Sequence, residues 1–459
     1  MAIVAPLSAP SAQSHGIRLA ALVRVLCELG RVGRLSELGT TGPLVASAGT
    51  DSLFHCLFGR DAIRMAADLL PDFPAVAHTT LIELARLQGV EDNSRSEEEP
   101  GRIVHEHRHP DDPHAMRLAK HWDFPYYGAV DTTPQWINLL GAYTERHGLD
   151  ILDERLTDRL WRPVTLRDSL LAALAWISRR LDDPIGSGFV WVRRANSQGL
   201  RNQVWEDSFD SYYHADGTLF DEALPYAPVA VQAYAYDALL VAADLLEASP
   251  GPLPVEPGQL RGRAALLRER LLAEFWLPQR GIFAHAVVIQ PDHSLQPAHV
   301  VASAAGHLLA SRVLEGADAR IQREQLIARF AEPDLLAGAG IRTKSTAAQR
   351  FEPGSYHNGS TWPMDTGVIA DGLRQWGQNE AADALEQRII AGCSAVGGFP
   401  EFFRGDTDGS ISVNTCTVDT IVDGVPNRLE QPPQADQGWT ATRVWRILRQ
   451  CGAIELPPR

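Results

Sequence analysis

The sequence lacks the features that mark membrane and secreted proteins. It holds no run of about 18 or more apolar residues, so no membrane-spanning helix is expected. The N-terminus, MAIVAPLSAPSAQSHGIRLA, has no basic start followed by an apolar run and does not resemble a signal peptide. Cysteines are few, odd in number and never in C-x-x-C spacing, which indicates reduced thiols, not disulfides or a zinc site. These absences predict a cytoplasmic protein; the cysteines are Cys27, Cys56, Cys393, Cys416 and Cys451.

Positive charge is also in short supply. The chain carries 42 Lys and Arg against 57 Asp and Glu, a formal net charge of −15. An acidic chain repels nucleic acids and anionic membranes, so neither is expected as a partner, and the charge suits a neutral ligand. There is no G-x-S-x-G elbow, no Walker A motif and no convincing G-x-G-x-x-G after a strand. This weakens the serine hydrolase, NTPase and dehydrogenase hypotheses.

Strand-like alternation is scarce, and apolar residues recur mainly at helical spacing. The clearest alternating segments are 188–194, 281–290 and 410–418, which we expect to form short hairpins. About twelve helices are predicted, at 17–30, 60–71, 74–88, 132–147, 163–181, 227–248, 258–275, 300–314, 319–331, 362–376, 379–394 and 436–451.

The connections between these helices alternate between short and long. The three longest, 89–131, 182–226 and 395–435, hold most of the Trp, Asp, Glu and His outside helices, and long loops in compact domains are usually functional. The pattern predicts an all-α fold of six helical hairpins closed into an (α/α)6 toroid, a single catalytic domain over 1–459 with a flexible 1–15. An open α-solenoid is the alternative, but the chain shows no repeat of fixed period.

One long loop contains the segment VWEDSFDSYYHADG (204–217), in which aromatic and acidic side chains alternate closely. Sugar rings stack on aromatic faces and their hydroxyls bond to carboxylates, so Trp205, Asp207, Asp210 and His214 are candidate sugar contacts. An apolar neighbour can raise the pKa of a carboxyl group enough for it to protonate a glycosidic oxygen. The alternative is a solvated acidic loop with one buried Trp.

A second isolated carboxyl group lies in GGFPEFFRGD (397–406), where Glu401 is surrounded by three Phe residues. It forms either a salt bridge, with Arg404 as the nearest partner, or half of a catalytic pair, because glycosidases need two carboxylates. Asp207 follows the fifth predicted helix and Glu401 the eleventh. On a closed ring of six hairpins both would lie at the same rim, on opposite sides of a pocket.

Three further segments carry candidate ligand contacts. YHNGSTWPMDT (356–366) leads into a helix; it offers a sugar platform, or a helix cap at Ser360 or Thr361 with the Trp in the core. FGRD (58–61) opens another helix, where an Asp also suits the helix dipole. The His-rich EEEPGRIVHEHRHP (97–110) lacks metal-ligand spacing, so no metal site is predicted. The candidates are Arg60, Asp61, His105, Glu106, Tyr356, His357, Asn358, Trp362 and Asp365.

Several segments, in order, resemble the bacterial amylo-α-1,6-glucosidase (glycogen-debranching) family: FGRDAIRMAADLL, ARLQG, EEPGRIVHEHR, YYGAVDTTPQWI, GLRNQVWEDSFDSYYHADG, GIRTKS and SYHNGSTWPMDT. The WEDS loop is more distantly similar to that of mannosylglycerate-hydrolase and trehalase-like glycosidases. The resemblance runs over about 50–405. It implies an (α/α)6 toroid, inverting hydrolysis of an α-glucosidic bond without a cofactor, Asp207 as acid and Glu401 as base. It also adds Tyr127 and Asp131, from YYGAVDTTPQWI, to the candidate substrate contacts.

The chain departs from that family in three places. The family's N-terminal β-rich domain is not represented, because only about 15 residues precede the first predicted helix. Glu206 stands where the family usually has Lys, which could raise the pKa of Asp207 or repel anionic substrates. Residues 419–439 match the family's C-terminal rim only loosely, with Pro433 and Gln434 as the local equivalents of a Pro-Gln pair before a helix.

The leading hypothesis is therefore an inverting α-glucosidase of the debranching type. A hydrolase of a small α-glucoside, such as a disaccharide or a glucosylated compatible solute, is the alternative that the missing domain favours. A non-catalytic carbohydrate-binding protein on the same toroid and an isomerase or epimerase using His105 and His357 also stay open. The linkage, the aglycone and the oligomeric state, including a homo-oligomer, are not determined by the sequence.

Overall fold

A computed structural model of the chain describes residues 16–49, 52–249, 255–413, 416–422 and 425–456. This part of the chain is mostly helical. Its α-helices are α1 (Leu19–Leu29), α2 (Gly59–Leu69), α3 (Pro74–Arg86), α4 (Pro113–Leu118), α5 (Thr132–His147), α6 (Leu166–Asp182), α7 (Val229–Ala248), α8 (Pro257–Glu274), α9 (Arg320–Arg329), α10 (Pro363–Gln375), α11 (Asn379–Val396) and α12 (Gly438–Gln450). Its 3-10 helices are η2 (Leu35–Glu37), η3 (Asp150–Asp153), η4 (Pro184–Gly186), η5 (Ser303–Ala310) and η6 (Arg312–Leu314).

Short strands join the helices, and all of their pairings are antiparallel. β5 (Tyr226–Pro228), β8 (Ala286–Ile289) and β9 (Leu295–Pro297) form one sheet in the order β5-β8-β9. The other pairs are β1 (Leu57–Phe58) with β2 (Glu106–His107), β3 (Arg155–Thr157) with β4 (Pro163–Thr165), β6 (Trp276–Leu277) with β7 (Ile282–Phe283), β10 (Leu336–Ala337) with β11 (Gly340–Ile341), and β12 (Cys416–Val422) with β13 (Val425–Gln431).

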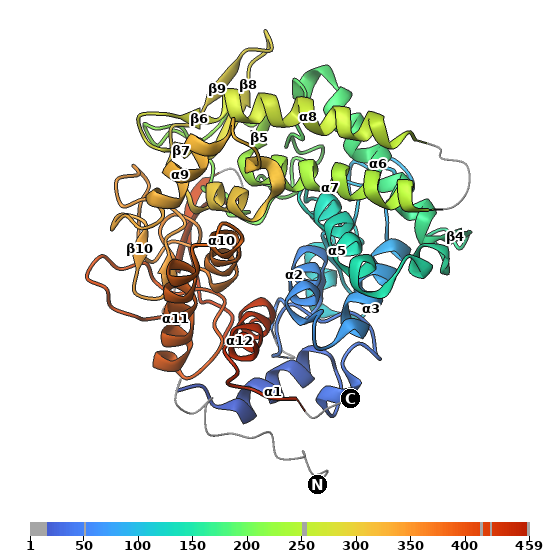
Figure 1. Cartoon of the computed structure of the whole chain (residues 1–459), viewed down its shortest axis with the longest axis horizontal. Helices are drawn as coiled ribbons and strands as arrows, with labels where there is room; N and C mark the ends of the chain where they lie inside the picture. The colour runs from blue at the N-terminus through green and yellow to red at the C-terminus, as the bar shows by residue number, and fades with distance from the viewer. Residues whose placement is uncertain (1–15, 50–51, 250–254, 414–415, 423–424, 457–459) are drawn as a thin grey trace.

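Six inner elements contact one another in a closed cycle. The contacts run α2–α5–α7–η5–α10–α12 and return from α12 to α2, so the first and last of these elements lie side by side although the whole chain separates them. Figure 1, which looks along the short axis of the molecule, shows these elements around a common centre. Each inner element also contacts an outer helix that neighbours it around the ring: α3, α6, α8, α9, α11 and α1.

The inner helices are apolar because both of their sides are covered. α7, with the sequence VAVQAYAYDALLVAADLLEA, has buried residues around most of its circumference. By length and composition it is the one described helix that could cross a membrane, but 72% of that window is buried inside the structure. This differs from the sequence expectation that no such segment exists; burial between neighbouring helices accounts for its apolar character.

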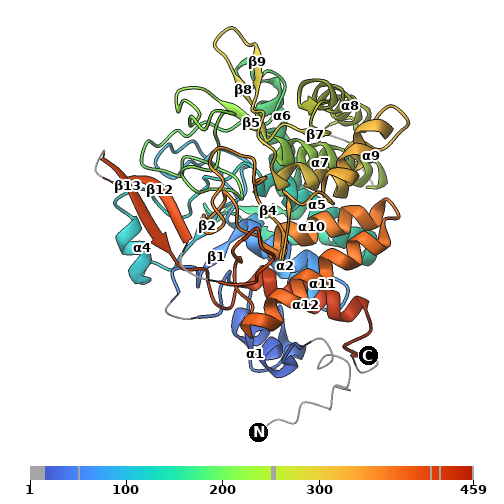
Figure 2. The same cartoon turned by 90° about the vertical axis from the view of Figure 1, so that its left-hand side faces the viewer.

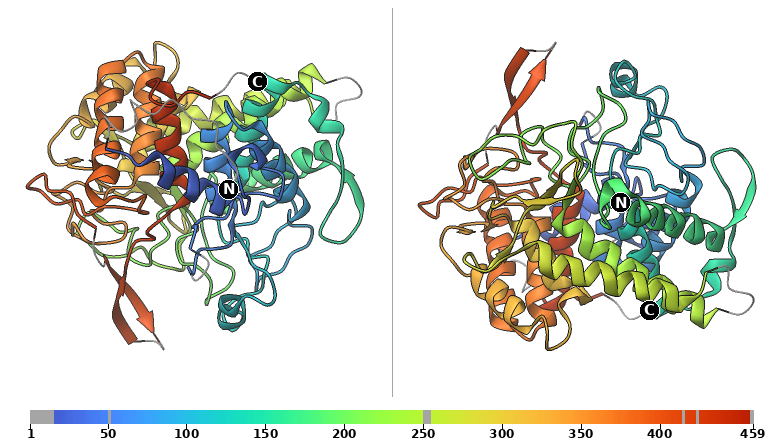
Figure 3. Two further views of the ribbon diagram at one scale, coloured as in Figure 1. Left: turned by 90° about the horizontal axis from the view of Figure 1, so that it is seen from below. Right: turned by 90° about the horizontal axis from the view of Figure 1, so that it is seen from above.

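The inner helices begin at the same end of the ring, where loops and short strands gather. Figures 2 and 3 show most of the loops and the projecting β12–β13 hairpin at this end. Asp61 is in the first turn of α2, Asp131 is the N-cap residue of α5, and Asp365 is in the first turn of α10. The chain order of the helices therefore brings acidic residues from distant segments to one end.

Most predicted helices are present, with two differences. The segment 300–314, expected to be α-helical, contains η5 and η6 instead, and α4 has no predicted counterpart. At Gly306 in η5 an added Cβ would lie 2.7 Å from atoms of Ile369 and Phe330, so this inner element packs unusually closely against its neighbours. Residues 188–194 form only an isolated bridge, at Val192, and among the described residues of 410–418 the strand β12 covers those from Cys416 onward. The predicted flexible segment 1–15 lies outside the described residues.

Candidate active site

Asp207 lies in the loop after α6, at the end of the ring where the inner helices begin. Its side chain is 28% exposed, enough to reach a ligand. Arg60 Nη2 lies 3.4 Å from Asp207 Oδ2, and Arg60 Nη1 lies 3.0 Å from Asp131 Oδ2. Burial raises the pKa of Asp207 to about 7 against the positive charge of Arg60, and the carboxylates of Asp131 and Glu106 add to the rise. Such a carboxyl group can hold a proton near neutral pH, as a general acid must.

Glu401 is a second carboxyl group at this end, and it is buried. The Tyr356 hydroxyl donates to its Oε1 at 2.5 Å, and the Gln434 backbone N–H donates to its Oε2 at 3.1 Å. The salt bridge with Arg404 that the sequence left open is not formed, because Arg404 pairs with Asp406 at 3.0 Å. Burial raises the pKa of Glu401 to about 8, against the two hydrogen bonds.

A third buried carboxyl group, Asp61, belongs to the same cluster. The Gln437 side-chain amide donates to Asp61 Oδ1 at 3.1 Å. Burial raises the pKa of Asp61 to about 7, against Arg60, with a further contribution from Asp207. Asp61 and Asp207 also raise the pKa of Glu401 electrostatically, so the three groups share one environment. Removing a proton from any of them therefore affects the other two.

The segment 356–358 connects the loops that carry Asp207 and Glu401. Tyr356 bonds to Glu401, as described above. His357 Nδ1 lies 3.0 Å from the hydroxyl of Ser208, the residue after Asp207. Asn358 Nδ2 donates to the backbone oxygen of Asp210 at 3.1 Å. Candidates that the sequence placed in three separate segments therefore lie together.

Glu206 points away from this cluster and into the core. It is completely buried, its Oε1 accepts from Lys344 Nζ, and its Oε2 lies 2.5 Å from His285 Nε2. Burial alone would raise the pKa of Glu206, but the hydrogen-bonded His285 and Lys344 hold it well below its usual range. The expectation that Glu206 raises the pKa of Asp207 or repels anionic ligands is thus corrected: its charge is neutralised by Lys344 inside the protein.

The two predicted tryptophan platforms are buried. Trp362 stacks on His357 at 4.9 Å, Trp205 stacks on His307 at 5.9 Å, and the two tryptophan rings meet edge to face. Trp362 is in the core, as the alternative interpretation held, but the predicted side-chain cap is absent because Trp362 itself is the N-cap residue of α10. These rings form an aromatic layer beneath the loops. They do not form an exposed surface.

Several polar atoms of the site are buried and have no hydrogen-bond partner within the described part of the chain. Four of them come from four different segments. A ligand rich in hydroxyl groups would supply the missing partners, because buried polar groups are normally hydrogen-bonded. The four atoms are Arg60 Nε, His105 Nδ1, Trp205 Nε1 and His357 Nε2.

The His-rich segment contributes to the rim of the site. His105 is buried with its ring edge against Phe58, and burial lowers its pKa well below the usual value. Glu106 accepts a short hydrogen bond from Arg108, which also bonds to Asp112 at 3.0 Å. Among the described residues no three His, Cys, Asp or Glu side chains are grouped as metal ligands would be.

Two candidates face other surroundings. The Tyr127 hydroxyl donates to the backbone oxygen of Leu87 at 2.7 Å, at the end of α3. The His214 ring packs on Phe220 at 4.9 Å, within its own loop. Neither has a contact with Asp207, Asp61 or Glu401 among the interactions of the described residues. Tyr127 was named from the family resemblance and His214 for its place beside Asp207 in the sequence, and neither criterion determines side-chain direction.

Sequence reasoning missed three residues that organise the site. Lys344 and His285 hold Glu206, and Gln437 holds Asp61. Lys344 lies within GIRTKS, one of the segments that carried the family resemblance, so the sequence did offer a reason to name it as a site residue. His285 and Gln437 stand in segments with no pattern that would single them out.

Residues 102–439 match the model of the mannosylglycerate hydrolase MGH1-like glycoside hydrolase domain. The chain belongs to this glycoside hydrolase family. No curated protein matches the chain by sequence. Of the two groups that the sequence resembles, the match supports the mannosylglycerate-hydrolase-like one.

Solved glycosidases share the fold of this family member. A mannosylglycerate hydrolase of family GH63 from Thermus thermophilus, in complex with Tris, aligns with a TM-score of 0.61 and 14% identity over 94% of this chain and 99% of that one. The complex of the same enzyme with Tris and D-glycerate aligns at 0.60, with 16% identity over 94% and 100%. A rhamnosidase from Klebsiella oxytoca aligns at 0.51, with 15% identity over 98% and 66%.

Proposed function

We propose that this glycoside hydrolase cleaves an α-glucosidic bond with inversion, in a single (α/α)6 catalytic toroid, with Asp207 as general acid and Glu401 as general base. The observation that carries the proposal is the pair of carboxyl groups with raised pKa values on separate loops, joined through Tyr356, His357 and Asn358. Most glycosidases use two carboxyl groups, one protonated as the acid and one ionised as the base. A cytoplasmic location is part of the proposal and is based on the sequence.

The proposed step moves two protons. Asp207 donates its proton to the glycosidic oxygen as the bond from that oxygen to the anomeric carbon breaks. Glu401 accepts a proton from a water whose oxygen bonds to the anomeric carbon from the opposite face. Inverting enzymes leave room for this water by holding the carboxyl groups roughly 6.5–9.5 Å apart. The unpartnered polar atoms of Arg60, His105 and His357 would bind the sugar hydroxyls.

A small α-glucoside, such as a glucosylated compatible solute, is the substrate class we favour. The family model is named for an enzyme of a small glycoside, and similar solved structures are described with D-glycerate or glucose. A branched α-glucan is the second candidate, because segments such as YYGAVDTTPQWI resemble the debranching family. Glucose release from a panel of small glucosides and branched glucans would separate the two.

Asp207→Asn tests the acid. We expect it to lower kcat on the best substrate by about 10²–10⁴-fold, the range of general acid–base catalysis, with an unchanged circular dichroism spectrum. Asp216→Asn is the matched control, because Asp216 is an exposed Asp of the same loop, and we expect less than about a twofold change. A variant Asp207→Asn with most of the wild-type rate would refute the assignment.

The product anomer tests the stereochemistry. NMR during the first turnovers should show the β-anomer of the released sugar, followed by mutarotation. An α-anomer as first product would mean that Glu401 does not act as a base on water. Binding of a glucoside without any turnover by the wild-type protein would instead support the non-catalytic alternative.

A further inference from the structure

A cavity is lined by the inner elements α2, α5, α7, η5 and α10, and none of its lining residues belongs to the carboxyl cluster. Its volume is about 760 Å³, within the range of small-molecule sites. Its walls include polar residues of α2 and α5, which also carry site residues, and of α7 and η5: Arg64 of α2, Gln135 and Asn138 of α5, Tyr234 and Asp237 of α7, and His307 of η5. The proposed chemistry uses none of these side chains.

One wall of this cavity carries the side-chain amide of Gln135, which has no hydrogen-bond partner among the described residues. The residue is 4% exposed, and neither its Nε2 nor its Oε1 has a hydrogen-bond partner within the described part of the chain. Asn138 is one turn away; its Nδ2 donates to the backbone oxygen of Tyr234 at 3.1 Å, but its Oδ1 has no such partner. One donor and two acceptors are thus available to a molecule inside the cavity.

The other walls favour a neutral ligand. Leu139, Val241 and Val368 are apolar and suit C–H groups. Charges of both signs are present, with the Arg64 guanidinium 5.2 Å from the ring centre of Tyr234 and the Asp237 carboxyl group on the next turn of α7. A strongly charged molecule would meet like charge on one side.

We propose that this cavity is a second binding site, for a neutral hydroxylated molecule the size of a monosaccharide or a small polyol. Hydroxyl groups both donate and accept, as Gln135 and Asn138 require, and the C–H faces match the apolar walls. His307 belongs to the wall between this cavity and the candidate active site. Its Nδ1 bonds to the Tyr234 hydroxyl, its Nε2 lies 2.7 Å from Asp365 Oδ1, and its ring stacks on Trp205.

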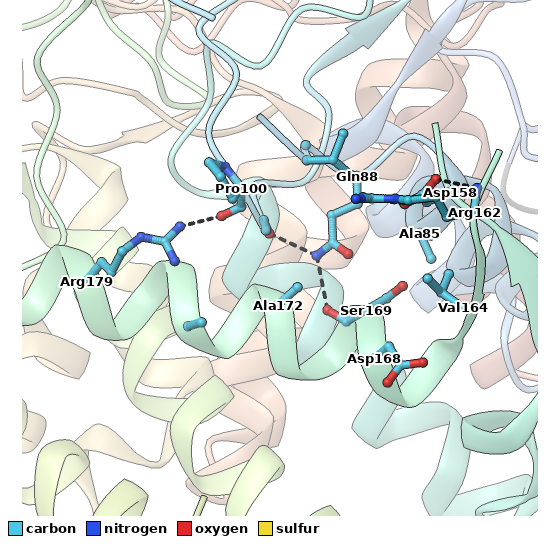
Figure 4. A pocket seen from close by; sticks show the side chains of 14 residues that line it. Ala85, Gln88, Pro100, Asp158, Arg162, Val164, Asp168, Ser169, Ala172 and Arg179 are labelled. Carbon is cyan, nitrogen blue, oxygen red and sulfur yellow. Dashed lines mark hydrogen bonds and ion pairs between the residues drawn. The ribbon is translucent and has the colours of Figure 1, made fainter. Parts of the chain in front are cut away.

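A smaller pocket is lined by a glutamine, Gln88, whose amide is hydrogen-bonded within the protein. It measures about 330 Å³ and is shown in Figure 4, where the Gln88 amide bonds to two backbone carbonyls. Gln88 Nε2 donates to Gly101 at 2.9 Å and to Ser169 at 3.0 Å, and the residue is 5% exposed. Gln88 and Gln135 are thus equally buried glutamines that differ in whether the protein satisfies them.

The test is equilibrium dialysis of the full-length Asp207→Asn protein with labelled glucose and with labelled glycerol. We expect that at least one probe shows a class of binding that Gln135→Leu weakens at least tenfold and Gln88→Leu leaves unchanged. This class is defined by its response to Gln135→Leu, so failure of the proposed catalytic function would not remove it. Absence of such a class with both probes would overturn the proposal.

Thermal unfolding without ligand gives an independent readout. Gln135→Leu should raise Tm by about 1–2 °C, because it removes a buried amide that has no hydrogen-bond partner among the described residues. Gln88→Leu should lower Tm, because it leaves the backbone carbonyl groups of Gly101 and Ser169 without this hydrogen-bond donor. If Gln135→Leu lowered Tm as much as Gln88→Leu does, Gln135 would be bonded within the protein and the site would not exist.

Discussion

At the scale of single residues, the site depends on how each carboxyl group is partnered. Asp207, Asp61 and Glu401 are desolvated with few compensating bonds, and their pKa values rise. Glu206, the immediate neighbour of Asp207, is more deeply buried, and yet its pKa falls because Lys344 and His285 surround it. Two adjacent carboxyl groups therefore differ in protonation state because their charged and hydrogen-bonded partners differ, not because of burial alone.

Tyr356→Phe should shift the pH dependence of the rate. The Tyr356 hydroxyl donates to Glu401 and favours its ionised form. Its removal should raise the pKa of Glu401, which already lies above that of Asp207, so less Glu401 is ionised: kcat/KM at and below neutral pH should fall, about tenfold, and the basic limb should move to higher pH. A kcat/KM profile that is lowered uniformly without a shift would argue that Tyr356 contacts the substrate instead.

Lys344→Met should destabilise the fold. The change leaves Glu206 charged in a completely buried position, and breaking a buried ion pair typically costs about 3–5 kcal/mol. Denaturant unfolding would measure the loss, and the double variant Glu206→Gln/Lys344→Met should recover part of it. Arg95→Met, in the exposed pair with Asp123, is the control and should cost about 1 kcal/mol or less. A small loss for Lys344→Met would mean that water reaches Glu206.

At the scale of elements, the start of each inner helix determines where the reacting groups lie. α2 begins with Gly59, directly before Arg60 and Asp61. An added Cβ at Gly59 would lie 2.1 Å from the backbone oxygen of Val104 and 2.9 Å from the Thr132 side chain. Glycine therefore lets α2 approach both the His-rich segment and α5, and this approach brings Arg60 within reach of Asp131.

Gly59→Ala should lower both stability and activity. Because the contact at 2.1 Å is with backbone, the start of α2 must shift, and overpacking of this kind costs about 1–3 kcal/mol. Gly262→Ala is the matched control in the outer helix α8, where nothing lies within 4 Å of the added Cβ, and it should stabilise the protein by about 0.5–1 kcal/mol. Thermal unfolding and kcat/KM of both variants would test this; an unchanged kcat/KM for Gly59→Ala would count against it.

At the scale of the whole molecule, closing the ring buries acidic groups together and makes stability depend on pH. Asp61, Asp207 and Glu401 have raised pKa values in the fold, so the folded protein binds more protons than the unfolded chain between pH 4 and 8. The free energy of unfolding therefore falls as pH rises through this range and these three groups lose their protons. Buried His105 and His357 have lowered pKa values and act in the opposite direction, but only below about pH 6.5.

Stability should therefore fall between pH 6.5 and pH 8. The triple variant Asp61→Asn/Asp207→Asn/Glu401→Gln carries neutral groups of the same shape and should show a smaller fall. Tm measured for both proteins at the two pH values would test this. Equal slopes would mean that the three groups are already ionised in the folded protein at pH 6.5.

The sequence alone was sufficient for the local features. Apolar periodicity placed most helices, and the residue types of 204–217, 356–366 and 397–406 indicated the loops where polar and aromatic side chains meet. These features depend on neighbours in the chain, which periodicity and composition record. The tertiary structure decided what each side chain faces: it buried Glu206 against Lys344, turned Trp205 and Trp362 into the core, and left Gln135 without a partner among the described residues. Those outcomes depend on contacts between segments that are far apart in the sequence, where no local pattern reports them.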